Sequence, residues 1–449
     1  MSDELRDLLH VVALTELGRR LQEAREAAGM SRDDLADGLV NASYLALVED
    51  GRRRPALKLI TAFCVRLASS PEVVISGLSS EEHARIRSTL DLADLGLSSN
   101  DTTAALAAAE DALACLRGRT APSLSRAAYR LRARAREASG DLDGAIIDLV
   151  AIIDEATEPA QQDLAWVRDL IALSRCYRES GQLDRAVQVE RAARPDIEAR
   201  GLDATTEAVQ LTITTSGAYI FQGDLGQAMR TCRRAIAEAE RHGLPLAKAS
   251  AQWNASVVLK ATGERDAALR LAQEALAIFE ASDDTKNLGR LRSHVASLHL
   301  TVRPSDPDLA LTLLERAGTE LDWSTAGSLD RSSHLLAVAT AQFSLGNIGH
   351  AQRMLEESCE LAPVGATALR AHQAALRGRL AAVRDDLNSA RREYESAVAL
   401  LTASGADQHA AQLWFELGDL FMKAGAEAPA IDAYRRAGAS QGLRPPSVN

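Results

Sequence analysis

The strongest constraint on the fold is a repeat with a step of about 40 residues, which covers most of the chain. An alanine recurs at nearly equal steps, and a small or apolar residue follows seven positions later. Glycine stands five positions before six of these alanines, where a turn between two helices favours a left-handed backbone. Such a period predicts stacked helix pairs, because each pair buries its apolar side only against its neighbours. The aligned alanines are Ala105, Ala145, Ala186, Ala228, Ala268, Ala310, Ala351, Ala390 and Ala430.

The last of these units is the most informative about the kind of repeat. Its pattern resembles the tetratricopeptide (TPR) repeat, although the step exceeds the roughly 34 residues usual for that repeat. We therefore expect an all-α chain in which residues 80–440 form a right-handed α-solenoid of about nine TPR-like helix pairs. The residues that carry the resemblance are Trp414, Leu417, Gly418, Phe421, Ala430, Tyr434 and Ala437.

Residues 1–78 follow a different pattern of short helices. Leucines at helical spacing around Leu17 predict a helix that ends at Gly29. Ser31 and Asp34 have the spacing of a capping box, and Asn41 can cap the next helix. Several short helices, two of them joined by a tight turn, predict a helix-turn-helix domain in this segment.

Two segments in this region, LGRRLQEAREAAGMSRDDLA and NASYLALVEDGRRRP, resemble the Cro/repressor (XRE) type of helix-turn-helix DNA-binding domain, which has five helices. The short turn between them is also similar to that of the Gram-positive peptide-pheromone receptors (RRNPP class), which append a helical-repeat domain. The resemblance implies a structural ion pair between Arg25 and Glu49. It also implies DNA contacts by Arg32, Asn41, Ala42, Ser43, Tyr44, Leu47, Arg52, Arg53 and Arg54.

The charge balance leaves two interpretations of this domain open. The chain carries 51 Lys+Arg against 62 Asp+Glu, a net charge of −11, and the segment 1–80 holds ten basic and twelve acidic side chains. Binding to a DNA backbone depends on local charge, because fields are screened beyond about 10 Å at 0.1 M salt. Grouped arginines therefore favour a DNA-binding domain. The alternative is a TPR protein-interaction scaffold with a vestigial helix-turn-helix.

The first helix of each pair in a TPR solenoid lines its concave face. At the corresponding positions of this chain, ten side chains are cationic and three are acidic. This excess, together with apolar residues, predicts a groove for a peptide or a small anionic molecule. The alternative is that the arginines pair with carboxylates of neighbouring helices and the rings belong to the repeat core. The predicted groove residues are Arg130, Arg134, Arg168, Arg175, Arg178, Ile213, Phe221, Trp253, Arg292, His299, Arg303, His372 and Arg379.

Signatures of catalysis and of metal or cofactor binding are missing from the sequence. It has no Walker A loop, no HExxH and no GxSxG, and its five cysteines are far apart. We therefore expect no enzyme activity, no catalytic residue, no metal and no cofactor. No apolar run reaches the roughly 18 residues of a membrane span, and the N-terminus lacks the pattern of a secretory signal.

Together these patterns predict a sequence-specific transcriptional regulator in the cytoplasm, associated with the nucleoid. Its expected partners are a double-stranded DNA operator, a peptide or small-molecule effector in the groove, and a second copy of the chain in a homodimer. No membrane partner is expected. Residues 441–449 are expected to form a flexible tail.

Overall fold

The computed structural model describes residues 2–99, 101–156, 162–302, 304–324, 326–363, 365–403 and 407–440. Every regular element in these ranges is an α-helix. The expected tail, residues 441–449, lies outside them. The first ten helices are α1 (Ser2–Val11), α2 (Leu14–Ala27), α3 (Arg32–Ala36), α4 (Ala42–Glu49), α5 (Leu57–Arg66), α6 (Pro71–Ser76), α7 (Ser80–Ser98), α8 (Thr102–Leu116), α9 (Pro122–Ser139) and α10 (Leu142–Glu155).

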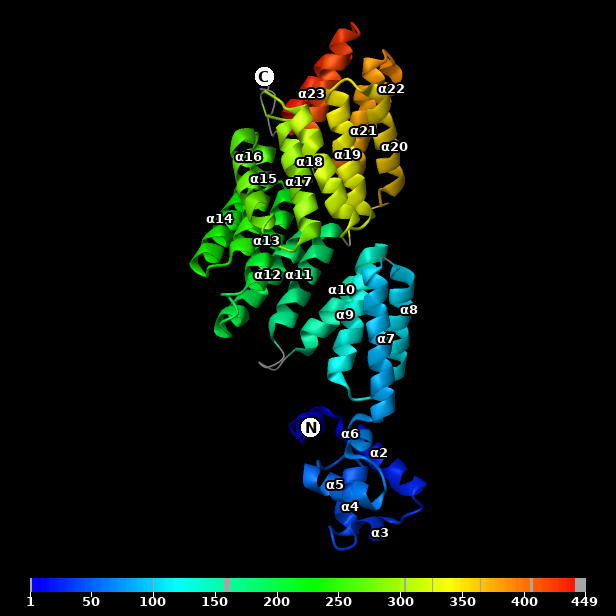
Figure 1. Cartoon of the computed structure of the whole chain (residues 1–449). Coiled ribbons are helices and arrows are strands. Elements are labelled where there is room, and N and C mark those ends of the chain that lie inside the picture. The colour runs from blue at the N-terminus through cyan, green and yellow to red at the C-terminus, as the bar shows by residue number, and fades with distance from the viewer. Residues whose placement is uncertain are drawn as a thin grey trace, which may run out of the picture. The chain divides into compact units, whose positions relative to one another are not determined.

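The remaining helices stand side by side in successive pairs (Figure 1). In each pair the odd-numbered helix comes first and the even-numbered helix second. They are α11 (Leu164–Glu179), α12 (Leu183–Ala199), α13 (Thr206–Phe221), α14 (Leu225–Arg241), α15 (Pro245–Thr262), α16 (Arg265–Phe279), α17 (Thr285–His299), α18 (Pro307–Asp322), α19 (Ser328–Ser344), α20 (Ile348–Leu361), α21 (Thr367–Val383), α22 (Leu387–Ala403), α23 (Asp407–Lys423) and α24 (Glu427–Ser440).

The repeat seen in the sequence corresponds to the packing of these pairs. All nine aligned alanines lie near the start of the second helix of a pair and have no exposed surface. The residues seven positions later are also buried, from Ala112 to Ala437. At this crossing a small residue lets two helices approach closely, and in the last pair the ring of Tyr434 occupies the space beside Gly418. The solenoid fold predicted from the alanines is therefore confirmed.

In seven of the pairs the turn contains a left-handed residue five positions before the aligned alanine. The six glycines found there in the sequence all have positive φ, from 72° at Gly425 to 88° at Gly140. In the pair α21–α22 the same position is Asp385, with a φ of 61°. The turn geometry is thus kept even where glycine is absent, because an aspartate tolerates the left-handed region better than most residues.

Helices α2 to α6 form the helix-turn-helix domain, and α1 packs against α5 and α6 ahead of it. The predicted capping box at the start of α3 is present: Asp34 N donates to Ser31 Oγ, and Ser31 N donates to Asp34. Asn41 Oδ1 accepts a 2.7 Å hydrogen bond from Tyr44 N and caps α4. The side chains enclosed in the core of this domain are Leu17, Leu21, Leu35, Leu45, Val48, Ile60 and Phe63.

The chain divides into two compact units, Met1–Ile152 and Ile153–Asn449. The boundary expected between residues 78 and 80 falls inside the first unit. Contacts inside this unit join the segments on its two sides. Leu78 packs into the core of α7, α8 and α9, and Thr120 N donates a 2.8 Å hydrogen bond to Ser76 O. The helix-turn-helix domain and the first helices after it therefore pack as one unit.

Candidate nucleic-acid interface and ligand groove

Helix α4, which follows Asn41 in the helix-turn-helix domain, presents an open face. Asn41, Ser43 and Leu47 are exposed and Ala42 is half-buried, whereas Leu45 and Val48 on the opposite side enter the core. This alternation follows from the helical period, because residues three and four apart share a face. The exposed group is small and contains one hydroxyl and one amide that can hydrogen-bond to a base edge.

A buried carboxylate holds α4 against the helices before it. Glu49 has no exposed side-chain surface and accepts hydrogen bonds from Arg25 Nε at 2.7 Å and Arg25 Nη2 at 3.1 Å. The Arg25–Glu49 ion pair expected from the resemblance is therefore formed. Arg32 Nε also donates a 2.7 Å hydrogen bond to Glu49, so one donor of the Arg32 guanidinium is already used inside the protein.

The arginines expected at the DNA differ in their availability. Arg54 donates to Leu9 O and, at 3.0 Å, to Val12 O, so it caps the end of α1. Arg52 and Arg53 are exposed, and the guanidinium of Arg53 lies 5.0 Å from the ring centroid of Tyr44. Arg52 and Arg53 are consequently the cations of this turn that face solvent beside α4.

Several arginines predicted for the groove meet carboxylates on neighbouring helices. Arg134 Nη1 lies 2.7 Å from Asp94, Arg168 Nη2 lies 2.6 Å from Glu207, and Arg379 makes two hydrogen bonds to Glu416. Each partner is 37 to 40 residues away. For these three arginines the alternative interpretation holds: they pair with carboxylates of neighbouring helices instead of standing free in a groove. The pairing occurs because one repeat step places the two charges side by side.

Two predicted groove residues lie inside the protein instead. Ile213 is 2% exposed and packs in the core between α13, α14 and α15, because its position in α13 faces the second helices. Arg292 is 4% exposed and its guanidinium binds both Glu280 and Glu320 at 2.8 to 3.1 Å. The prediction that Ile213 and Arg292 line the groove was therefore wrong.

The other groove residues have mixed surroundings. Arg130, Arg175 and His372 take part in further polar interactions of the protein. His299 is half-buried, and burial lowers its pKa. Arg303 lies outside the described residues.

Three predicted groove residues make cation–ring contacts on the first helices α11, α13, α15 and α17, and we call the side of these helices that carries Arg178, Phe221, Trp253 and Arg290 the first-helix face. The guanidinium of Arg178 lies 5.9 Å from the ring centroid of Phe221, which is 45% exposed. The guanidinium of Arg290 lies 5.5 Å from the ring centroid of Trp253. The ring of Trp253 also packs edge-on against the ring of Phe279. Arg290 was not predicted from the sequence, because it lies outside the positions of the TPR template.

Polar groups also meet between α15 and α17, where Lys260 is one of the ten cations at the predicted inward positions and Ser256 and His294 were not assigned. Lys260 Nζ donates to Ser297 Oγ at 3.0 Å, and Ser256 Oγ lies 2.9 Å from His294 Nε2. Burial, with a contribution from the charge of Arg265, lowers the pKa of Lys260 to about 8. Burial and then the charge of Lys260 lower the pKa of His294 to about 3, so His294 is neutral at pH 7. Sequence spacing alone could not identify this pair, because its partners come from two different repeats.

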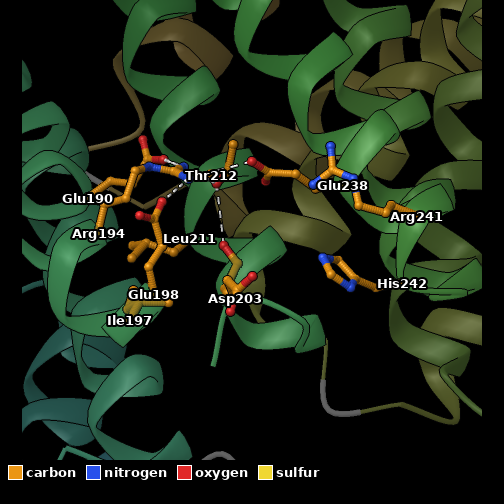
Figure 2. Close-up of a pocket in the computed structure, with 11 residues that line it drawn as sticks. Glu190, Arg194, Ile197, Glu198, Asp203, Leu211, Thr212, Glu238, Arg241 and His242 are labelled. Carbon is orange, nitrogen blue, oxygen red and sulfur yellow. Dashed lines mark hydrogen bonds and ion pairs between the residues drawn. The ribbon is translucent and has the colours of Figure 1, made fainter. Parts of the chain in front are cut away.

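A surface pocket lies between α12, α13 and α14, away from the predicted groove residues. Figure 2 shows Arg194 and Glu198 on one side of it and Arg241 and His242 on the other. The buried carboxylate beside it, Glu190, accepts hydrogen bonds from Arg194, Arg234 and Thr212. Most charges of this pocket are thus neutralised by each other, as in a structural ion-pair network.

Within the described ranges, no group of three or more His, Cys, Asp or Glu side chains is arranged to hold a metal ion. No helix in those same ranges has the length and apolar character needed to cross a membrane.

Comparisons with known proteins support the two-part architecture. The family described as "Helix-turn-helix domain" matches residues 16–74. No curated protein matches the chain in sequence. The apo form of the quorum sensor NprR from B. thuringiensis is similar over 80% of this chain and 99% of its own, with a TM-score of 0.50 and 12% identity.

Two further solved structures are similar at lower TM-scores. Bacillus thuringiensis PlcR in complex with the peptide PapR7 and DNA covers 60% of this chain and 95% of its own, at 14% identity and a TM-score of 0.36. A Rap protein complexed with competence and sporulation factor covers 96% and 98%, at 12% identity and a TM-score of 0.47. At these identities the likeness concerns the fold. The chain is a helix-turn-helix protein with a TPR-like solenoid, the architecture that its resemblance to the peptide-pheromone receptors implied.

Proposed function

We propose that this protein is a sequence-specific DNA-binding transcriptional regulator whose solenoid binds an effector, a peptide or a small anionic molecule. The observation that carries the proposal is the open face of α4, with Asn41, Ser43 and Leu47 exposed and Arg52 and Arg53 beside it. In this type of domain the recognition helix enters the major groove, and cations at its edge contact phosphates.

The solenoid provides the second part of the proposal. Its first-helix face brings arginines and aromatic rings together, as a ligand with charged and apolar groups requires. The similar fold of NprR, which is named as a quorum sensor, is compatible with an effector-binding role. An effector changes operator binding only if it prefers one arrangement of the protein.

A homodimer is part of this proposal. One helix-turn-helix domain presents a single recognition helix, whereas half-sites about one helical turn apart require two. Native mass spectrometry of the freshly purified full chain should therefore give twice the mass of the chain, plus the mass of any retained effector.

The DNA interface is tested by electrophoretic retardation of the DNA of the protein's own promoter. Replacing Arg52 and Arg53 together by alanine should weaken retardation at least about tenfold, and should reduce the slope of log K against log salt by about 2. The matched control replaces Arg85 and Arg87, two exposed arginines of α7, by alanine and changes the net charge equally.

Equal retardation by the wild type and the Arg52→Ala/Arg53→Ala variant would contradict the proposed interface. Absence of retardation by the wild type at moderate salt, together with a stable protein partner, would favour an interaction scaffold with a vestigial helix-turn-helix.

A further inference from the structure

The first-helix face contains a guanidinium whose hydrogen-bonding capacity is incompletely used. Arg178 Nη2 lies 3.3 Å from Glu179, but Arg178 Nε is enclosed and has no acceptor among the described residues. Burial lowers the pKa of Arg178; the charge and hydrogen bond of Glu179 oppose this, and the positive charges of Arg175 and Arg290 add to the lowering. A buried donor without an acceptor costs free energy, and so does a group of like charges. An anion that pairs with the accessible part of the Arg178 guanidinium relieves the repulsion between the like charges.

Two aromatic rings hold the arginines of this site in place. The guanidinium of Arg178 lies over Phe221, and that of Arg290 lies over Trp253. A ring face attracts a guanidinium but accepts no strong hydrogen bond, so N–H groups remain for a ligand. Both arginines keep accessible surface, 22% of the side chain for Arg178 and 45% for Arg290.

Other arginines on the first helices have their charge neutralised by a carboxylate of the next repeat. Arg168 has Glu207, and Arg379 has Glu416 in a two-bond arrangement. Arg178 instead faces α13 at Gly217, a residue without a side chain. Arg290 has Asp330 at 3.0 Å, but Lys286 shares that carboxylate. In these described ion pairs the three cations Arg178, Arg290 and Lys286 share two carboxylates, Glu179 and Asp330.

We propose that Arg178 and Arg290 form a subsite for an acidic group, a carboxylate or a phosphate, whose apolar neighbour packs on Phe221 and Trp253. Arg175 adds positive potential. This inference rests on the proposed effector-binding role and names the chemistry of that effector. A planar guanidinium can bind either acid with two hydrogen bonds, so both sources share one recognition mode.

The test uses the full chain and 8-anilinonaphthalene-1-sulfonate, a fluorescent probe that joins an anion to aromatic rings. Its uncharged analogue, N-phenyl-1-naphthylamine, is the matched probe. Arg178→Met and, separately, Arg290→Met should each weaken binding of the sulfonate about tenfold or more, the loss expected for one charge-assisted contact. Neither variant should change binding of the uncharged probe.

The control variant is Arg185→Met. Arg185 lies over the ring of Tyr177 at 5.8 Å, like Arg178 over Phe221, but belongs to the second helix α12. The Arg185→Met variant should bind both probes as the wild type does. The circular dichroism spectra of all three variants should match that of the wild type. Equal losses for Arg185→Met and Arg178→Met, or unchanged sulfonate binding by both Arg178→Met and Arg290→Met, would overturn the subsite.

Displacement of the sulfonate probe distinguishes the source of the acid. N-acetylphenylalanine supplies a carboxylate and phenyl phosphate supplies a phosphate, and at least one should displace the probe. N-acetylphenylalaninamide, which has no acid, should not. Displacement by the amide as readily as by the acids would overturn the proposal. No DNA is present in these assays, so their failure is separate from failure of operator binding.

Discussion

His294 is a neutral histidine held between α15 and α17, next to a lysine. Ser256 hydrogen-bonds to its ring, and Lys260 lies close enough to disfavour a second positive charge. Burial is the larger cause of its lowered pKa of about 3, against 6.5 for the free side chain. Protonating His294 in the folded chain therefore requires stronger acid than protonating it in the unfolded chain.

We expect the protein to lose stability in acid because His294 becomes protonated when the chain unfolds. Between pH 6.5 and 3 the unfolded chain binds a proton at His294 that the folded chain does not, so the free energy of unfolding falls as pH falls. As pH falls through this range, the free energy of unfolding of the wild type should decrease by up to about 1.4 kcal/mol per pH unit relative to that of the His294→Gln variant. Urea midpoints of both proteins from pH 7 to 4.5 measure the difference.

Exposed His350 offers a control on the same solenoid. The His350→Gln variant should follow the pH dependence of the wild type. Parallel curves for wild type and His294→Gln would show that His294 is protonated as easily in the folded chain as in the unfolded one.

Among elements, the contact of α2 with α4 depends on one glycine. A Cβ at Gly18 would lie within 2.5 Å of Val48 O and would also meet Glu49 O. Both are backbone atoms of α4, so no rotamer change relieves the clash. The same two helices share the Arg25–Glu49 pair, which requires their close approach.

Replacing Gly18 by alanine should therefore destabilise the helix-turn-helix domain by about 1–3 kcal/mol, the usual cost of overpacking. Amide hydrogen exchange of α2 and α4 in the full chain reports it as faster exchange. Gly349→Ala is the control, because nothing lies within 4 Å of a Cβ at that position in α20. Unchanged exchange in Gly18→Ala would mean that α2 can move away from α4 at little cost.

At the scale of the whole molecule, the helix-turn-helix domain is fastened to the first helices of the solenoid. Arg20 is 8% exposed, and its guanidinium donates to Ile75 O at 2.5 Å and to Gly118 O at 2.8 Å. It thus connects α2 with the end of α6 and with the loop between α8 and α9. These bonds occupy the guanidinium of Arg20 inside the first unit.

Replacing Arg20 by methionine should loosen this connection, because two carbonyl oxygens lose a charged donor. Hydrogen exchange of residues 75–79 and 117–121 in the full chain should become about tenfold faster or more. Arg19→Met is the control, since Arg19 is exposed and its ion pairs within the described ranges, with Glu16 and Glu23, both lie in α2. Identical exchange in Arg20→Met and wild type would show that the core around Leu78 suffices to join the two parts.

The sequence by itself determined the repeat, its register and the helix-turn-helix domain. These features depend on local rules: a small residue at each helix crossing, a left-handed residue at seven of the turns inside pairs, and caps at Ser31 and Asn41. Each rule involves residues close together in the chain, so a pattern in one dimension suffices.

Only the tertiary structure decided which charges are engaged. Arg292 meets Glu320 and Arg168 meets Glu207 across neighbouring helices, whereas Arg178 keeps an unsatisfied Nε. The sequence places an arginine on a helix but leaves open whether the facing helix offers a carboxylate, a ring or a glycine. Pairing depends on distances of a few ångströms between side chains of different repeats, and packing of the helices sets those distances.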